Sequence, residues 1–316
     1  MSSEHHLYTI GMWAPHIHVG AYLEAAPIKS TVVYVSPRDS DKESTTGAIT
    51  QTLDNAKDAT AERKVLYIVG SFWGKPGVAA MRSWAVENGY TTDETCAVED
   101  QAVAVAQTLL SRSAVDRKTS IVMQRYYNDH VDTLRLFDNH LNGRDINNTS
   151  NFLAGIKNLG GVNDKRTDSE KMIDYFEGVT PGCDYESIMA IGRIISDGLQ
   201  RMALDHSIKT TAFYELPDGR VVAFFSQIPG IARQLHAAVL QQHGASKHDV
   251  SVGIHTNPKE RRHELSVSSA HKDTDAAQVL AVENDGNGGK TTAHFNQAME
   301  PTEAIHFLKG AKRISP

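Results

Sequence analysis

Short runs of β-branched residues alternate with helical patterns through the first 125 residues of this 316-residue chain. Val32–Val35 and Val65–Val69 are apolar, are bounded by turn residues and are typical of buried strands. Between them, Ile49, Leu53 and Ala56 recur at helical spacing. Strands that alternate with helices favour a parallel sheet covered by helices. We therefore predict an α/β fold with a helix-covered parallel sheet for the N-terminal part.

The same criteria predict further elements in the first half. They are a strand at Leu7–Met12, helices at Gly77–Asn88, Ala97–Ser111 and Asn128–Leu141, and a short strand at Ile121–Met123. The stretch Asn158–Ser169 contains a glycine pair followed by polar residues, which predicts a linker or hinge.

A second succession of elements fills the C-terminal part of the chain. It comprises a helical pattern at Glu186–Leu204, a strand at Val221–Ser226, a helix at Gly230–His243, strands at Val250–Ile254 and His263–Ser269, a further segment at Asp273–Ala281 and a glycine loop at Asp285–Lys290. This order predicts a smaller α/β domain. We therefore expect domains at 1–160 and 206–316, joined by a helical connector at 161–205.

Composition limits the classes of protein that this chain can belong to. A net charge of −6 provides no global positive field for nucleic acid. Two cysteines cannot build a disulfide framework or a four-cysteine zinc site, and they suggest a reducing compartment. No apolar run is long enough for a membrane span, and the first residues lack a signal core. We expect an intracellular protein of the cytoplasm or mitochondrial matrix that is not secreted.

The glycine loop carries a resemblance to a known family. Asn287-Gly288-Gly289-Lys290-Thr291-Thr292-Ala293-His294-Phe295 resembles the G-G-G-H-x-x-A-A-G-F loop of the C-terminal substrate-binding domain of the DHH phosphoesterase superfamily. Members of that superfamily cut phosphodiesters in short oligonucleotides, single strands or cyclic dinucleotides. The resemblance implies a DHH-like N-terminal domain, a DHH-associated C-terminal domain and a cleft between them.

The metal-binding motifs of the family are altered in this sequence. The family holds divalent metals, usually manganese, with aspartates and histidines that follow several strands. Trp13–Tyr22 resembles its C-P-D-G-x-x-A-A motif, with His16 at the aspartate position. Tyr67–Phe72 resembles its second motif, with Gly70 at the aspartate position. The D-H-H triplet is absent, and Asp138 corresponds to a later family aspartate.

A competing register places the first motif at Val35–Asp41, which contains Asp39 and Asp41. That register leaves Gly70 and the missing triplet unexplained, so we favour a solvated loop at Arg38–Glu43, and the register stays open.

If the chain is an active enzyme, we expect its catalytic residues to be Asp39, Asp41 and Asp138. We expect manganese or magnesium to be held by His16, His18 and Asp138.

The glycine loop is the best candidate for a ligand site. Its backbone N–H groups could bind phosphate. The candidate residues are Gly286, Asn287, Gly288, Gly289, Lys290 and Ser268. Ser268 stands where the family's S-x-R-S motif has arginine. A tight turn before the last strand explains the same glycines equally well.

Two further groups of residues have competing interpretations. His16 and His18 would share one face of an extended strand and could bind a metal, although ordinary histidines are favoured. Trp13, Phe72 and Trp73 could stack on a base, although burial in the core is more common.

We predict a non-catalytic DHH phosphoesterase-like protein, a pseudoenzyme that serves as a structural or binding subunit of a larger assembly and needs no cofactor. The physical reason is that metal-assisted phosphodiester hydrolysis needs clustered carboxylates. The alternatives are an active metal-dependent phosphoesterase on short RNA or small nucleotides, and a nucleotide- or RNA-binding module without hydrolysis. Other protein subunits are the expected partners.

Overall fold

The computed structural model describes residues 4–12, 16–70, 73–114, 116–161, 164–178, 184–228, 231–298 and 305–315. The chain divides into two units, Met1–Ile195 and Ser196–Pro316, and each is presented by itself. The domain boundaries expected from the sequence, at 160 and 205, and the cleft expected between the domains stay predictions.

The first unit contains a four-stranded parallel sheet within its described residues. Its strands are β1 (Glu4–Gly11), β2 (Thr31–Val35), β3 (Arg63–Ile68) and β4 (Thr91–Asp93), in the order β2-β1-β3-β4. Leu7 of β1 pairs with Thr31 on one side and with Leu66 on the other. Strand β1 therefore lies inside the sheet, with a neighbouring strand on each side.

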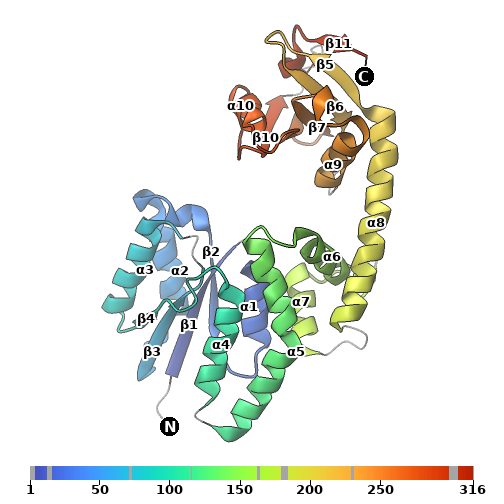
Figure 1. The fold of residues 1–316 in the computed structure, drawn as a ribbon. Coiled ribbons are helices and arrows are strands. Elements are labelled where there is room, and N and C mark those ends of the chain that lie inside the picture. The colour runs from blue at the N-terminus through green and yellow to red at the C-terminus, as the bar shows by residue number, and fades with distance from the viewer. Residues whose placement is uncertain are drawn as a thin grey trace. The chain divides into compact units, whose positions relative to one another are not determined.

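Helices surround this sheet (Figure 1). The helices of this unit are α1 (His16–Ala25), α2 (Thr46–Ala56), α3 (Lys75–Glu87), α4 (Gln101–Ser113), α5 (Arg117–Leu141), α6 (Ile146–Lys157) and α7 (Asp168–Glu177), together with the short 3₁₀ helices η1 (Pro37–Ser40) and η2 (Glu43–Thr45). Of these, α6 and α7 pack against α5 and α1.

Adjacent side chains of β1 enter two different cores, because successive residues of a strand point to opposite faces. Leu7 packs with the side chains of α2 and α3, whereas Tyr8 packs with those of α1, α4 and α5. The predicted α/β class with a parallel, helix-covered sheet is confirmed.

Two local predictions for the first unit are wrong. Ile121–Met123 is part of helix α5, because the Asp116 side chain accepts hydrogen bonds from the N–H groups of Lys118 and Thr119 and starts a helix there. His16 and His18 lie on helix α1 rather than on a strand. Residues two apart on a helix point about 200° apart, so the two histidines do not share a face.

The second unit is built on a mixed seven-stranded sheet within its described residues, in the order β11-β5-β6-β7-β8-β10-β9. Its strands are β5 (Ala212–Glu215), β6 (Val221–Ser226), β7 (Val250–Asn257), β8 (Arg262–Ser269), β9 (Asn287–Gly288), β10 (Thr292–Ala298) and β11 (Lys312–Ile314). Only β6 and β7 are paired in parallel among these strands. The predicted smaller second α/β unit is confirmed.

The two faces of this sheet carry separate cores. One core lies under α10 (Ala276–Val282) and includes Val252, Leu265 and Phe295. The other lies under α9 (Ala232–His243) and includes Phe225 and Leu235. Helix α8 (Tyr185–Thr210) begins in the first unit and ends in the second. The second unit also contains the 3₁₀ helices η3 (Ala245–Lys247) and η4 (His306–Leu308). None of the helices in the described ranges is long and apolar enough to cross a bilayer.

Two glycines allow α6 and α8 to cross at very short range. A Cβ atom at Gly155 would lie 2.2 Å from the Ile188 carbonyl oxygen, and one at Gly192 would lie 1.7 Å from the Asn151 carbonyl oxygen. Both obstacles are backbone atoms inside helices, so neither can move away cheaply.

We predict that Gly192→Ala lowers the free energy of unfolding by about 1–3 kcal/mol, because the added methyl forces the helices apart. Gly198→Ala on the same helix is the matched control, since a Cβ there meets nothing within 4 Å. It should be neutral or stabilising by up to about 1 kcal/mol. Urea unfolding of both variants measures the difference, and equal stabilities would contradict the close crossing.

Candidate site at the carboxyl edge of the parallel sheet

The order of strands in the first unit places a candidate site between β1 and β3. The chain leaves β1 toward β2 on one side, and it leaves β3 toward β4 on the other. In open α/β sheets, ligands bind outside the carboxyl ends of the strands where the direction of the connections reverses. The segments that follow Gly11, Val35 and Ile68 are therefore the ones to inspect.

The segment after β3 carries a glycine in a conformation that side chains disfavour. Gly70 has a φ of 104°, and its N–H donates to the Cys96 carbonyl at 2.9 Å. An aspartate at this position would be strained. Trp73 is buried, and its Nε1 donates to the Val69 carbonyl at 2.9 Å, so the indole belongs to the core. Trp13 and Phe72, the other two predicted aromatic residues, lie outside the described residues.

The segment after β2 closes onto the N-terminus of α3. Ser40 is fully buried, and its Oγ accepts a hydrogen bond from the Gly74 N–H at 3.1 Å. A Cβ at Gly77 would lie 2.3 Å from the Ser40 Cβ, and one at Gly74 would lie 2.9 Å from Asp41 Oδ1. The Asp41 carboxylate therefore lies beside the positive end of the α3 dipole. This packing, which the sequence did not predict, gives Ser40 and Asp41 local structural contacts.

Asp39 takes part in the same loop through its backbone. Its N–H donates to the Ser36 carbonyl at 3.0 Å, and its own carbonyl accepts from Thr45 Oγ1 at 3.0 Å. The Asp39 residue is partly exposed, whereas Asp41 is exposed.

The segment after β1 leads to His16 and His18, both of which are buried. Burial lowers the pKa of each imidazole to about 4, so both rings are neutral at pH 7. The His18 ring lies 5.5 Å from the Phe137 ring, centroid to centroid. These contacts place His18 in the apolar core between α1 and α5.

Asp138 is buried near the end of α5 and caps another helix. Its Oδ1 accepts from the Ala102 N–H at 2.8 Å, and its Oδ2 accepts from the Val103 N–H at 3.0 Å. Both N–H groups belong to the first turn of α4, where no intrahelical acceptor exists. Asp100, at the capping position of α4 itself, makes no such bond. Burial raises the pKa of the Asp138 carboxyl to about 6, although the two N–H groups oppose that rise.

The residues at this edge do not fit the two divalent ions that the family resemblance implies. Hard divalent ions need several oxygen ligands. Asp138 is the one buried carboxylate among the candidates, and both of its oxygens already accept backbone N–H groups. Within the ranges that the structure describes, no three His, Cys, Asp or Glu side chains lie close enough together to hold a metal ion.

The glycine loop of the second unit forms a hairpin between β9 and β10. The Gly286 N–H donates to the Ala281 carbonyl at 2.7 Å, and the Gly289 N–H donates to the Thr292 carbonyl at 2.8 Å. A Cβ at Gly286 would lie 2.4 Å from the His294 carbonyl oxygen, and one at Gly288 would lie 2.3 Å from the Ala293 Cα. Close backbone contacts therefore require these two glycines, whether or not a ligand binds.

The other predicted ligand residues lie around this hairpin. Lys290 and Asn287 are exposed, and the Lys290 carbonyl accepts from Ser269 Oγ at 2.9 Å. Ser268 lies on β8, and its carbonyl accepts from Ser251 Oγ at 3.3 Å. Their role in ligand binding stays a prediction.

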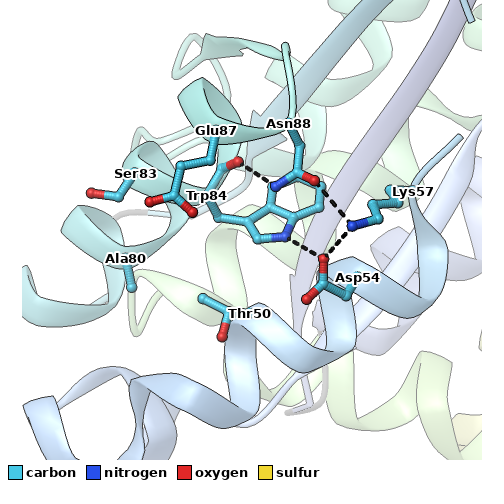
Figure 2. Close-up of a pocket in the computed structure, with 8 residues that line it drawn as sticks. All are labelled: Thr50, Asp54, Lys57, Ala80, Ser83, Trp84, Glu87 and Asn88. Carbon is cyan, nitrogen blue, oxygen red and sulfur yellow. Dashed lines mark hydrogen bonds and ion pairs between the residues drawn. The ribbon is translucent and has the colours of Figure 1, made fainter. Parts of the chain in front are cut away.

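A pocket of about 530 Å³ lies between α2 and α3 (Figure 2). Asp54 Oδ1 accepts from Lys57 Nζ at 2.8 Å and from Trp84 Nε1 at 3.1 Å, and Lys57 also donates to Asn88 Oδ1 at 3.1 Å. These residues belong to the C-terminal halves of the two helices or follow their ends. Helices that connect parallel strands run against them, so this pocket lies toward the amino edge of the sheet, away from the candidate site.

No family model matches the chain, and no curated protein matches it in sequence. Among solved structures, it is similar to the pGpG-specific phosphodiesterase PggH from Vibrio cholerae, with 10% identity and a TM-score of 0.48 over 94% of each chain. It is also similar to the DHH domain of a member of a family of ribosomal proteins, with 13% identity and a TM-score of 0.46 over 92% of this chain and 82% of that one.

CDC45 from Entamoeba histolytica is a third such structure, with 7% identity and a TM-score of 0.38 over 94% of this chain and 92% of that one. At these identities the likeness concerns the fold and says nothing about activity.

We predict that Asp138→Ala lowers the free energy of unfolding by about 2–4 kcal/mol, because it leaves two N–H groups of α4 without an acceptor. Asp100→Ala is the matched control and should cost less than about 0.5 kcal/mol. Chemical denaturation at pH 7 measures both. Equal effects of the two substitutions would show that the Asp138 cap contributes nothing.

The Asp138 carboxyl should also affect how stability depends on pH. Its pKa is higher in the folded chain, at about 6, than its ordinary value of 3.8, so the folded state binds this proton more tightly. Its contribution therefore favours folding below pH 4 and is lost as the pH rises through 6, by about 3 kcal/mol in all. Asp138→Asn should remove this trend from denaturation curves recorded between pH 4 and 7, and an unchanged trend would contradict it.

The buried histidines should have the opposite effect. The pKa of His18 is about 4 in the folded chain and 6.5 ordinarily, so protons favour the unfolded state. The folded chain keeps its full stability above pH 6.5, where the ring is neutral in both states. It loses stability as the pH falls to 4, because the unfolded chain binds the proton first. His18→Leu should therefore lose less stability than the native chain between pH 7 and pH 4.5. Parallel losses in the two proteins would refute the burial of a neutral imidazole.

Proposed function

We propose that this protein is a non-catalytic DHH phosphoesterase-like protein that acts as a structural or binding subunit of a larger assembly. One observation carries the proposal. The Asp138 carboxylate, which corresponds to a family metal ligand in the sequence, uses both oxygens to hold the first turn of α4. This arrangement gives the carboxylate a structural role, which supports a non-catalytic function.

The two other strand ends support the same proposal. Hydrolysis through paired ions needs ligands that converge on one point, so that the ions can activate water and stabilise the phosphoryl group. Gly70 occupies the place of one expected aspartate with a backbone conformation that disfavours a side chain. Asp41 lies beside the α3 N-terminus, where the helix dipole already stabilises its charge.

An active metal-dependent phosphoesterase is the second candidate, and one observation favours it. His16 and Asp39 follow the carboxyl ends of two adjacent strands, β1 and β2, which is where a ligand site in such a sheet is expected. In that case Asp39, Asp41 and Asp138 would serve the reaction, and the ion would be manganese or magnesium.

Turnover assays distinguish the two candidates. The full chain is incubated with manganese and either a dinucleotide or a nucleoside bisphosphate. We expect no turnover above that of the Asp138→Asn variant, because the native residue holds no ion. Manganese-dependent turnover that falls at least about 100-fold in Asp138→Asn but persists in Asp100→Asn would overturn the proposal.

The binding and structural roles have separate readouts. Calorimetric titration with mononucleotides tests whether a nucleotide binds, and Lys290→Ala tests whether the exposed lysine of the glycine hairpin contributes to that binding. A structural subunit should co-migrate in native purification with other chains in a fixed stoichiometry. A protein that migrates alone at its own mass of 34.6 kDa and binds no nucleotide would contradict both roles.

A further inference from the structure

Asparagine is followed by glycine at three places in this chain, Asn88-Gly89, Asn142-Gly143 and Asn287-Gly288. Such a pair is a reactive setting for an asparagine, because the glycine nitrogen can attack the side-chain amide carbon with no side chain of its own in the way. The attack closes a succinimide ring and releases ammonia. Hydrogen bonds to the amide or to the glycine N–H oppose it, so the fold decides which pair reacts.

The first pair follows α3 and is held at both reacting groups. Asn88 Nδ2 donates to the Trp84 carbonyl at 2.9 Å, and Asn88 Oδ1 accepts from Lys57 Nζ at 3.1 Å (Figure 2). The Gly89 N–H donates to the Val86 carbonyl at 3.3 Å. Reaction at Asn88 therefore requires these bonds to break.

The second pair follows α5 and is held in the same way. Asn142 Nδ2 donates to the Glu99 carbonyl at 3.4 Å and to Asp100 Oδ1 at 3.3 Å. The Gly143 N–H donates to the His140 carbonyl at 3.0 Å. Both the leaving group and the attacking nitrogen of this pair are engaged.

The third pair forms β9, which is the edge strand of the second unit's sheet. Asn287 and Gly288 are both exposed. In the part of the chain that the structure describes, the Asn287 side chain takes part in no hydrogen bond. Its amide can therefore rotate toward the glycine nitrogen without losing a partner in the protein.

The register of the hairpin shows where the Gly288 N–H points. Gly288 is paired with Ala293, and the adjacent pair, Gly289 and Thr292, is joined by the bond from the Gly289 N–H to the Thr292 carbonyl. In antiparallel strands, hydrogen-bonded pairs alternate with pairs that are not bonded. Gly288 thus belongs to a pair that is not bonded, and its N–H points to the open edge of the sheet.

We propose that Asn287 is a site of spontaneous deamidation, which reacts in the folded chain while Asn88 and Asn142 are protected. The proposal concerns the hairpin of the second unit and does not depend on the function proposed above.

The proposed reaction conserves atoms and charge, and water is its co-reactant. The Gly288 nitrogen forms a bond to Asn287 Cγ, and the bond from Cγ to Nδ2 breaks. The proton of the Gly288 N–H leaves with the nitrogen as ammonia. Water then opens the succinimide at either of its two carbonyls, which gives aspartate or isoaspartate.

Both products change the glycine hairpin. Each adds a negative charge close in sequence to Lys290, in the loop whose residues are predicted to bind a ligand. Isoaspartate also lengthens the backbone between positions 287 and 288, which disturbs the pairing of position 287 with His294. The modification therefore alters both the charge and the shape of this loop.

Peptide mass spectrometry of the full chain measures all of these sites in one sample. The protein is incubated at pH 7, sampled over weeks and digested briefly at acidic pH, and synthetic peptides identify aspartate and isoaspartate. We expect Asn287 to convert at least about 10-fold faster than Asn88 or Asn142, since each of those must first break its hydrogen bonds. Asn287→Gln is the matched control, because glutamine would have to close a larger ring. It should give no product at position 287 and leave the other sites unchanged.

The unfolded chain shows whether the fold or the local sequence causes the difference. In guanidinium chloride the hydrogen bonds that protect Asn88 and Asn142 are lost, so both should convert at rates similar to that of Asn287. The proposal is wrong if Asn287 converts no faster than the other two in the folded chain. It is also wrong if the same difference persists after unfolding.

Discussion

The carboxylate of Asp138 holds two helices of the first unit together. The last turn of α5 presents this buried side chain to the first turn of α4, where two N–H groups lack partners of their own. The bonds are worth more than ordinary ones because the acceptor is charged. The same burial raises the pKa of Asp138 to about 6, so the helix dipole and the N–H groups oppose a considerable desolvation cost. Both oxygens of this carboxylate are therefore engaged in holding α4.

The loops that follow β2 and β3 are also held by hydrogen bonds within the first unit. Backbone and hydroxyl groups make the hydrogen bonds in these loops. Ser40 accepts from Gly74, and Gly70 donates to Cys96, so each loop satisfies its polar groups within the fold. In the second unit, the Gly286 N–H bonds to the Ala281 carbonyl at the end of α10, and the Gly289 N–H bonds to the Thr292 carbonyl within the β9–β10 hairpin.

Sequence patterns predicted the strands in which apolar residues form a continuous run or alternate with polar ones. The strands β3, β6 and β8 are short apolar or alternating runs, so their period was visible. Helix α1 was missed because its residues are buried on nearly every side and leave no polar face to mark a helical period. Strands β4, β9 and β11 are two or three residues long and carry no detectable pattern. The role of Asp138 could not be predicted, since its partners lie 35 and 36 residues away. The contacts of His236 with Ser251 and Ser266 could not be predicted either, because these partners lie 15 and 30 residues away.

The metal content of the native protein tests the central claim most directly. The protein is purified from its own source without chelators, dialysed against metal-free buffer and measured by elemental analysis. The account predicts manganese, iron and zinc far below one ion per chain, and the same result for Asp138→Asn. Two divalent ions per native chain that disappear in Asp138→Asn would contradict it, because the carboxylate would then be a metal ligand and not a helix cap.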